Sequence, residues 1–123
     1  MGGRLTTHVL DTAHGGPAAN VQIELWRIDS PTDTRQRTLL KTVRTNADGR
    51  TDEPLLADDE LTLGVYELVF ALGEYFSTTR SITVPIIPFL DHVPLRFGVA
   101  DANAHYHVPL LASPWAYSTY RGS

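Results

Sequence analysis

Short segments with alternating apolar and polar residues recur along the chain, and this period of two constrains the fold more than any other feature. Val21–Ile28 and Gly64–Phe70 show the alternation clearly, and His92–Val99 repeats it. Successive side chains of a β-strand point to opposite faces, so each segment predicts a half-buried antiparallel strand. Leu72–Thr79 is the segment that could hold a helical turn or two, although its Gly73 weakens a helix.

Further strands and connections follow from turn signals. The other strands are expected at Leu5–Leu10, at Leu39–Thr45 and on both sides of a corner at Ser113–Pro114. Pro85 and Pro88 make Val84–Leu90 a connector or an edge, because proline cannot donate to a β-ladder. Glu53–Leu63 is acidic and irregular, with Asp58–Glu60 as a solvated connection. Seven or eight short strands with almost no helix predict an all-β fold, an antiparallel sandwich of two sheets.

Length and composition restrict the class of protein. The chain has 123 residues, so residues 1–123 are expected to form a single domain with its own core. It contains no cysteine, which excludes a disulfide framework and a thiol nucleophile. The formal net charge of -4 argues against nucleic acid or an anionic membrane as a partner. No segment has the apolar length of a membrane span or a secretion signal, so a cytoplasmic protein is expected.

The C-terminal strands carry a polar face. In the histidine-containing strand, period two places His105 and His107 on the same side, roughly 7 Å apart. Beyond the corner, Ser118, Tyr120 and Gly122 again share one side. A buried sandwich face would be apolar, so these residues indicate a functional site rather than core packing.

These motifs resemble the signatures of the 5-hydroxyisourate hydrolases, the transthyretin-like enzymes of purine metabolism that act in urate degradation. The family's run His-Tyr-His-Val-Pro-Leu-Leu stands at His105–Leu111, and its closing Tyr-Arg-Gly-Ser stands at Tyr120–Ser123. Both motifs are contiguous and correctly placed, and the resemblance covers nearly the whole chain. It implies a transthyretin-type antiparallel β-sandwich of two four-stranded sheets with one short helix, assembled as a homotetramer around a central channel.

The resemblance also implies the reaction and its residues. The small-molecule substrate is 5-hydroxyisourate, whose ring is opened to 2-oxo-4-hydroxy-4-carboxy-5-ureidoimidazoline (OHCU) on the route from urate to allantoin. No metal and no cofactor is implied. The implied catalytic residues are His8, Arg50, His107 and Ser123. The implied substrate-binding residues are Arg50, Tyr120, His105 and Gly122.

These residue types suit the hydrolysis of a ring amide. The reaction needs a water made nucleophilic, a donor for the departing nitrogen, and positive or dipolar groups where the oxyanion develops. A histidine with a pKa of about 6.5 can accept a proton from water at neutral pH, whereas Arg50 stays protonated. Its planar guanidinium matches an anionic ring with paired acceptors. Which histidine is the base remains open.

Three alternatives have less support. A transthyretin-like carrier would bind a hydrophobic hormone in a channel between subunits, but such carriers lack the catalytic histidines, the arginine and the terminal tetrapeptide. A structural or adhesive sandwich module would leave the polar face unexplained. Zinc could be held by His8, His105 and His107 if they converge, yet no His-x-x-x-His spacing or carboxylate ligand supports this. His14 and His92 lie in a turn and near the start of a strand, and no role is expected for them.

Overall fold

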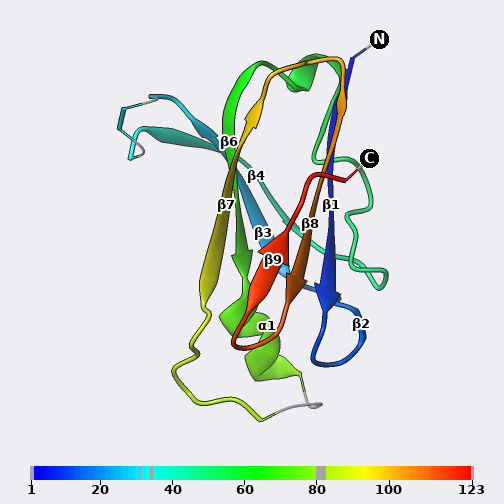
Figure 1. Ribbon diagram of the computed structural model, residues 1–123, viewed down its shortest axis with the longest axis vertical. Coiled ribbons are helices and arrows are strands. Elements are labelled where there is room, and N and C mark those ends of the chain that lie inside the picture. Colours follow the sequence, from blue (N-terminus) through cyan, green and yellow to red (C-terminus); the bar gives the residue numbers. More distant parts are fainter. Residues whose placement is uncertain (1, 31, 34, 80–82, 123) are drawn as a thin grey trace.

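The computed structural model describes residues 2–30, 32–33, 35–79 and 83–122, which form two β-sheets packed face to face (Figure 1). The first, which we call the histidine sheet, consists of β1 (Arg4–Asp11), β2 (Gly16–Pro17), β5 (Leu56–Ala57), β8 (His105–Ala112) and β9 (Tyr117–Thr119). The second consists of β3 (Gln22–Ile28), β4 (Arg37–Arg44), β6 (Gly64–Ala71) and β7 (His92–Val99). The helices are the short turn η1 (Asp58–Glu60) and α1 (Leu72–Thr78). The predicted two-sheet sandwich with one short α-helix is confirmed for the described part of the chain, but the histidine sheet has five strands rather than the four expected, because the two-residue β5 pairs with β1.

The strand order brings the two ends of the chain together. The histidine sheet has the order β2-β1-β8-β9, with β5 paired to β1 off this path, and the second sheet has the order β4-β3-β6-β7. The described strand pairs are antiparallel except β1 and β8, which run parallel from Arg4 opposite His105 to Asp11 opposite Ala112. A parallel pair needs a long crossover, and here the second sheet forms within that crossover. The N-terminal strand therefore lies beside the histidine strand.

The connections agree in part with the sequence expectation. Glu53–Leu63 is not irregular throughout, because it contains β5 and η1, and its Leu55 and Leu61 are buried in the core. Asp58–Glu60 is exposed, as expected. Val84–Leu90 forms no strand, which agrees with its two prolines. Across the described residues, no helix has both the length and the apolar character needed to cross a membrane.

The core lies between the sheets and is built from the alternate residues that face inward. Leu5 and Val9 of β1 and Leu110 of β8 are completely buried, and so are Leu68 and Phe70 of β6. Complete burial of a large apolar side chain stabilises a fold by about 1.5–3 kcal/mol. The residues between them point away from the core, and on the histidine sheet this outward face carries the polar side chains.

Candidate active site

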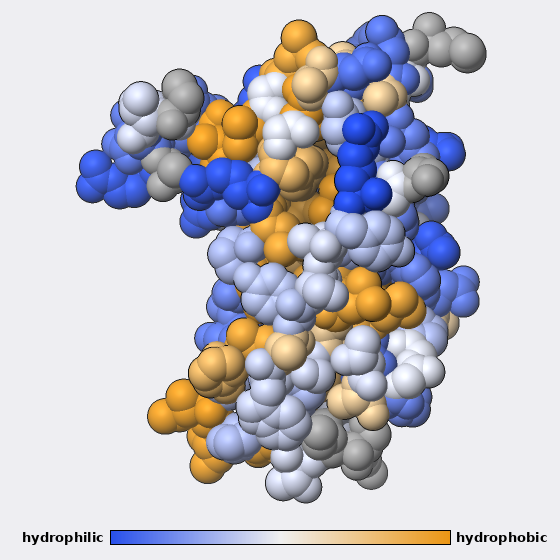
Figure 2. Space-filling model, in the orientation of Figure 1, coloured by the Kyte–Doolittle hydropathy of each residue, from blue (hydrophilic) through white to orange (hydrophobic). Residues whose placement is uncertain are grey.

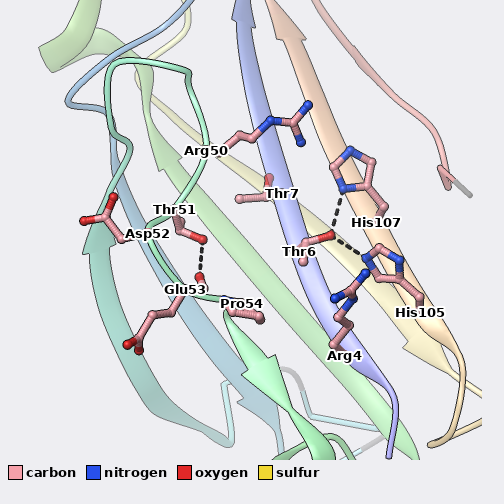
Figure 3. A pocket seen from close by; sticks show the side chains of 10 residues that line it. All are labelled: Arg4, Thr6, Thr7, Arg50, Thr51, Asp52, Glu53, Pro54, His105 and His107. Carbon is pink, nitrogen blue, oxygen red and sulfur yellow. Dashed lines mark hydrogen bonds between the residues drawn. The ribbon is translucent and has the colours of Figure 1, made fainter.

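The parallel pairing of β1 and β8 places one threonine between two histidines. Thr6 of β1 lies opposite His107 of β8. Thr6, His105 and His107 are all on the outward face of the histidine sheet. The Thr6 hydroxyl is hydrogen-bonded to Nε2 of His105 at 2.7 Å and to Nδ1 of His107 at 2.8 Å (Figure 3). The two imidazole ring centroids are 6.2 Å apart. The two histidines expected on one face are thus joined by a residue from the other end of the chain.

The turn after β4 brings Arg50 to the same face. Asn46 Oδ1 accepts hydrogen bonds from the backbone N–H groups of Asp48 at 2.9 Å and Arg50 at 3.2 Å. Gly49 has a φ of 75°, and its carbonyl oxygen accepts a hydrogen bond from the Val9 N–H at 2.8 Å. A Cβ at Gly49 would lie 2.4 Å from the Val9 carbonyl oxygen, so only glycine allows the turn to approach β1 this closely. The turn therefore docks on β1 and presents Arg50.

A cavity of about 460 Å³ opens over these side chains (Figure 3). The residues that line it are Arg4, Thr6, Thr7, Arg50, Thr51, Asp52, Glu53, Pro54, His105 and His107. The guanidinium groups of Arg4 and Arg50 form no hydrogen bond or ion pair with the part of the chain that the structure describes. Asp52 and Glu53 also line the cavity, but Figure 3 shows their carboxylates pointing away from the two histidines. The guanidinium groups are therefore the charges that favour an anionic ligand beside His105 and His107, and their planar forks suit a flat ring with paired acceptors.

His8 takes part in positioning the turn rather than in lining the cavity. Its Nε2 lies 2.9 Å from the carbonyl oxygen of Asp48. A carbonyl oxygen only accepts, so Nε2 of His8 has to carry the hydrogen. The bond holds the turn that precedes Arg50, and it leaves Nδ1 as the basic nitrogen of a neutral His8.

The surroundings keep the histidines of the cavity neutral. Burial is the main cause that lowers the pKa of His107, and the positive charge of Arg50 lowers it further, followed by His105 and His8. Burial, and then the charge of Arg4, lower the pKa of His105. Both groups have an ordinary pKa of 6.5, so each ring is uncharged at neutral pH and retains one basic nitrogen. A neutral imidazole beside a free guanidinium can take a proton from water while the cation stabilises a developing oxyanion.

The C-terminal segment continues along β8 beyond the end of β9 and reaches His107. The N–H of Gly122 donates a hydrogen bond to the His107 carbonyl oxygen at 2.7 Å. A Cβ at Gly122 would lie 2.6 Å from Cδ2 of the His107 ring, so glycine lets the backbone pack against that ring. Ser123 follows Gly122 in the chain and lies outside the described residues. Tyr120 is 60% exposed and, with Arg121, borders a separate groove between β7 and β8.

Thr6 and Arg4 are among the cavity residues that the sequence reasoning missed. Both lie on the outward face of β1 together with His8, and the period of two along Arg4–His8 could have indicated this shared face. Their importance arises from the register of β1 with β8, which joins residues far apart in the sequence and leaves no local pattern.

The zinc alternative gains no support from the described residues. Among them, no group of three or more histidine, cysteine, aspartate or glutamate side chains is placed to hold a metal ion. His105 Nε2 and His107 Nδ1 are both hydrogen-bonded to Thr6, and Nε2 of His8 is bonded to a backbone carbonyl.

Sequence comparison finds close relatives over the full length. The sequence model of the HIUase/Transthyretin family matches residues 5–122. The chain is 60% identical over 122 residues to the 5-hydroxyisourate hydrolase of Mesorhizobium japonicum, and the match covers 99% of this chain and 94% of that protein. It is 57% identical over 121 residues to the 5-hydroxyisourate hydrolase of Ralstonia nicotianae, with 98% and 99% coverage.

Solved structures have the same fold. (S)-allantoin synthase superposes with a TM-score of 0.89 at 47% identity, and the match covers 99% of this chain but 44% of that longer protein. Klebsiella pneumoniae 5-hydroxyisourate hydrolase gives a TM-score of 0.77 at 30% identity, with 98% and 99% coverage. Sea bream transthyretin in complex with thyroxine gives 0.81 at 25% identity, with 97% and 94% coverage.

Proposed function

Because the chain belongs to the HIUase/transthyretin family, we propose that it is an enzyme that hydrolyses 5-hydroxyisourate, opening the ring to OHCU. Full-length relatives named 5-hydroxyisourate hydrolase support this substrate. The observation that carries the proposal is the cavity in which a neutral His107 lies near the guanidinium of Arg50, which has no hydrogen bond or ion pair with the described residues (Figure 3).

His107 is the general base in the proposed reaction. Its Nδ1 is hydrogen-bonded to Thr6, which leaves Nε2 to accept a proton from water. The resulting hydroxide adds to the ring carbonyl, and the guanidinium of Arg50 stabilises the oxyanion. Nε2 of His107 then gives this proton to the departing ring nitrogen. Arg4, at the other end of the cavity in Figure 3, binds an anionic edge of the substrate.

The other predicted residues support this pair of groups. His8 holds the turn that carries Arg50, through its bond to the Asp48 carbonyl. His105 lines the cavity next to Thr6.

The terminal residues are proposed to complete the site. The backbone hydrogen bond of Gly122 to His107 brings the last described residue beside the base, and Ser123, which follows it in the sequence, is proposed as a further catalytic residue because the family resemblance implies that role. Tyr120 is proposed to contact substrate where a neighbouring subunit adjoins the site, because its ring is exposed here.

A homotetramer is proposed as the working form. Ile86, Ile87 and Phe89 are 101%, 84% and 75% exposed, and Trp115 is 54% exposed. Figure 2 shows apolar surface at the lower left of the molecule, near the loop that precedes β7 in Figure 1. Large exposed apolar patches mark contact surfaces, so further copies of the chain would cover them. Sedimentation tests this, and a fully active monomer would refute a site that needs a neighbouring subunit. The single domain and the cytoplasmic location stay predictions.

The test of the proposed function is to generate 5-hydroxyisourate with urate oxidase and to follow its decay with and without the protein. The compound is expected to decay unaided, so the protein must exceed that background. With His107→Asn the substrate should decay at the background rate. The melting temperature of this variant should be unchanged, because the His107 ring lies on the outward face and not in the core. A wild-type protein that does not accelerate the decay refutes the proposed function.

A carrier function is the second candidate, and the likeness to sea bream transthyretin favours it. The likeness is in the fold, and the sequence identity to sea bream transthyretin is lower than the identity to the 5-hydroxyisourate hydrolases. The cavity, with two neutral histidines and two guanidinium groups in its lining, suits a polar anion better than a hydrophobic hormone. Saturable binding of thyroxine without hydrolysis of 5-hydroxyisourate would reverse the choice.

A further inference from the structure

One hydroxyl between two imidazoles restricts where their hydrogens can be. Thr6 has a single hydrogen to donate, yet its oxygen lies 2.7 Å from Nε2 of His105 and 2.8 Å from Nδ1 of His107. Each hydrogen bond needs one hydrogen. When Thr6 donates to one ring, the other ring therefore has to donate its own N–H to Thr6.

Two arrangements of neutral rings use the Thr6 hydrogen in one of the two hydrogen bonds, and they give His107 opposite chemistry. In the first, Thr6 donates to His105, and Nδ1 of His107 donates to Thr6, so Nε2 of His107 is a free base. In the second, Nε2 of His105 donates to Thr6, Thr6 donates to His107, and Nε2 of His107 carries a hydrogen. In a third arrangement both rings donate to the two lone pairs of Thr6, and Nε2 of His107 is again a free base. Arg50 has only donors, and Figure 3 shows it on the side of the His107 ring away from Thr6, which favours the first arrangement over the second.

We propose that Thr6 joins His105 and His107 into one proton-transfer unit, in which the hydrogens of His105 set whether His107 acts as base or acid. The inference rests on the proposed hydrolase function and makes Thr6 and His105 positioning residues for His107.

Over one reaction cycle, His105, Thr6 and His107 together release as many protons as they take up. When Nε2 of His107 takes a proton from water, its Nδ1 hydrogen moves to Thr6, and the hydrogen of Thr6 moves to Nε2 of His105. The positive charge then lies on His105, and the hydroxide forms its bond to the ring carbonyl. When the C–N bond breaks, Nε2 of His107 gives its hydrogen to the departing nitrogen, and the transferred hydrogens return through Thr6. No further reactant is needed.

The charges around the two rings favour this direction of transfer. Arg50 and His8 act against a positive charge on His107, and Arg4 acts against one on His105, while each ring opposes a positive charge on the other. Two further groups thus oppose the charge on His107 and one opposes it on His105, which is the basis for placing the transferred proton on His105.

The kinetic test compares variants that keep or remove the bridging hydroxyl. Thr6→Val keeps the size of the side chain and should lower kcat by roughly tenfold or more with KM nearly unchanged, the scale of proton-transfer catalysis. Thr6→Ser retains a hydroxyl and should restore most of kcat. Thr12→Val is the matched control, because the Thr12 hydroxyl bonds the Ala112 carbonyl at 3.1 Å at the far end of the same two strands. That control should keep wild-type kcat.

Nitrogen-15 NMR of histidine-labelled protein tests the hydrogen positions without any turnover, so it stands even if the substrate is not the one proposed. Above the pKa of both rings, wild-type His107 should carry its hydrogen on Nδ1, and Thr6→Val should lose this preference. Three results would overturn the inference: wild-type kcat in Thr6→Val, no recovery in Thr6→Ser, or His107 of the wild type with its hydrogen on Nε2. A wild type that gives the expected spectra but no hydrolysis would refute the proposed function instead.

Discussion

Gly122→Ala is predicted to disable the enzyme by displacing His107, although residue 122 carries no side chain that could do chemistry. The added Cβ would lie 2.6 Å from Cδ2 and 3.2 Å from Cβ and Cγ of His107, and ordinary contacts begin at 3.4 Å. The ring or the terminal segment must therefore shift. A shift of about 1 Å at a reacting group can cost roughly 10²-fold in rate, which equals about 2.7 kcal/mol of barrier.

The assay is the decay of enzymatically generated 5-hydroxyisourate, with melting temperature and sedimentation recorded for each variant. Gly122→Ala should lose most of its kcat and melt within a few degrees of the wild type, because the contact is on the outward face. Gly98→Ala is the control, since a Cβ there meets nothing within 4 Å, and it should behave as wild type. If Gly122→Ala keeps kcat within twofold, the packing of the terminal backbone against His107 does not position the base.

Four further predictions concern charge and the end of the chain. Arg50→Lys should fold normally and lose most turnover, because an ammonium keeps the charge but not the two parallel donors; near wild-type kcat would make Arg50 an electrostatic bystander. Arg4→Gln should raise KM several-fold with little change in kcat, and an unchanged KM would remove Arg4 from substrate binding. The lowered pKa of His107 places the acid limb of the kcat/KM profile below pH 6.5, because protonation of His107 removes the base. The residual activity of Arg50→Gln should show this limb at a higher pH, because the variant lacks the positive charge that lowers the pKa of His107. A tag added after Ser123 should cut turnover at least tenfold, about 1.4 kcal/mol of barrier, whereas an N-terminal tag should not. Equal activities of the two tagged proteins would show that the C-terminal residues are not part of the site.

Most of the fold could be predicted because the alternation that marks a half-buried strand is local. Gln22–Ile28 and Gly64–Ala71 were expected within one residue of their observed bounds, and so was the short helix. The parallel pairing of β1 with β8 was not expected, since a pairing between the two ends of a chain depends on the packing of everything between them. β5 was missed for a similar reason, because two residues are too few to show a period.

The candidate site could be predicted only as a set of residue types. The histidine run and the family resemblance that it supports indicated which side chains to consider, but each hydrogen-bond partner depends on the docking of distant segments. His8 illustrates the limit: the family resemblance implied a catalytic group, and its hydrogen bond to the Asp48 carbonyl adds the role of holding a turn. Thr6 looked like an ordinary β-forming residue until the register placed it between two imidazoles.

The location of these residues explains how one fold can serve both a hydrolase and a transthyretin. The sandwich is specified by the inward residues of each strand, such as Leu5, Val9 and Leu110, whose burial stabilises the fold. The outward positions between them contribute little to the core, so Thr6 and His107 can be changed without loss of the sandwich. A rigid pair of hydrogen-bonded strands nevertheless holds these outward side chains in fixed register, which is what proton transfer over 2.7 to 2.8 Å requires. Function in this fold therefore varies on the outward face while the inward face preserves the architecture.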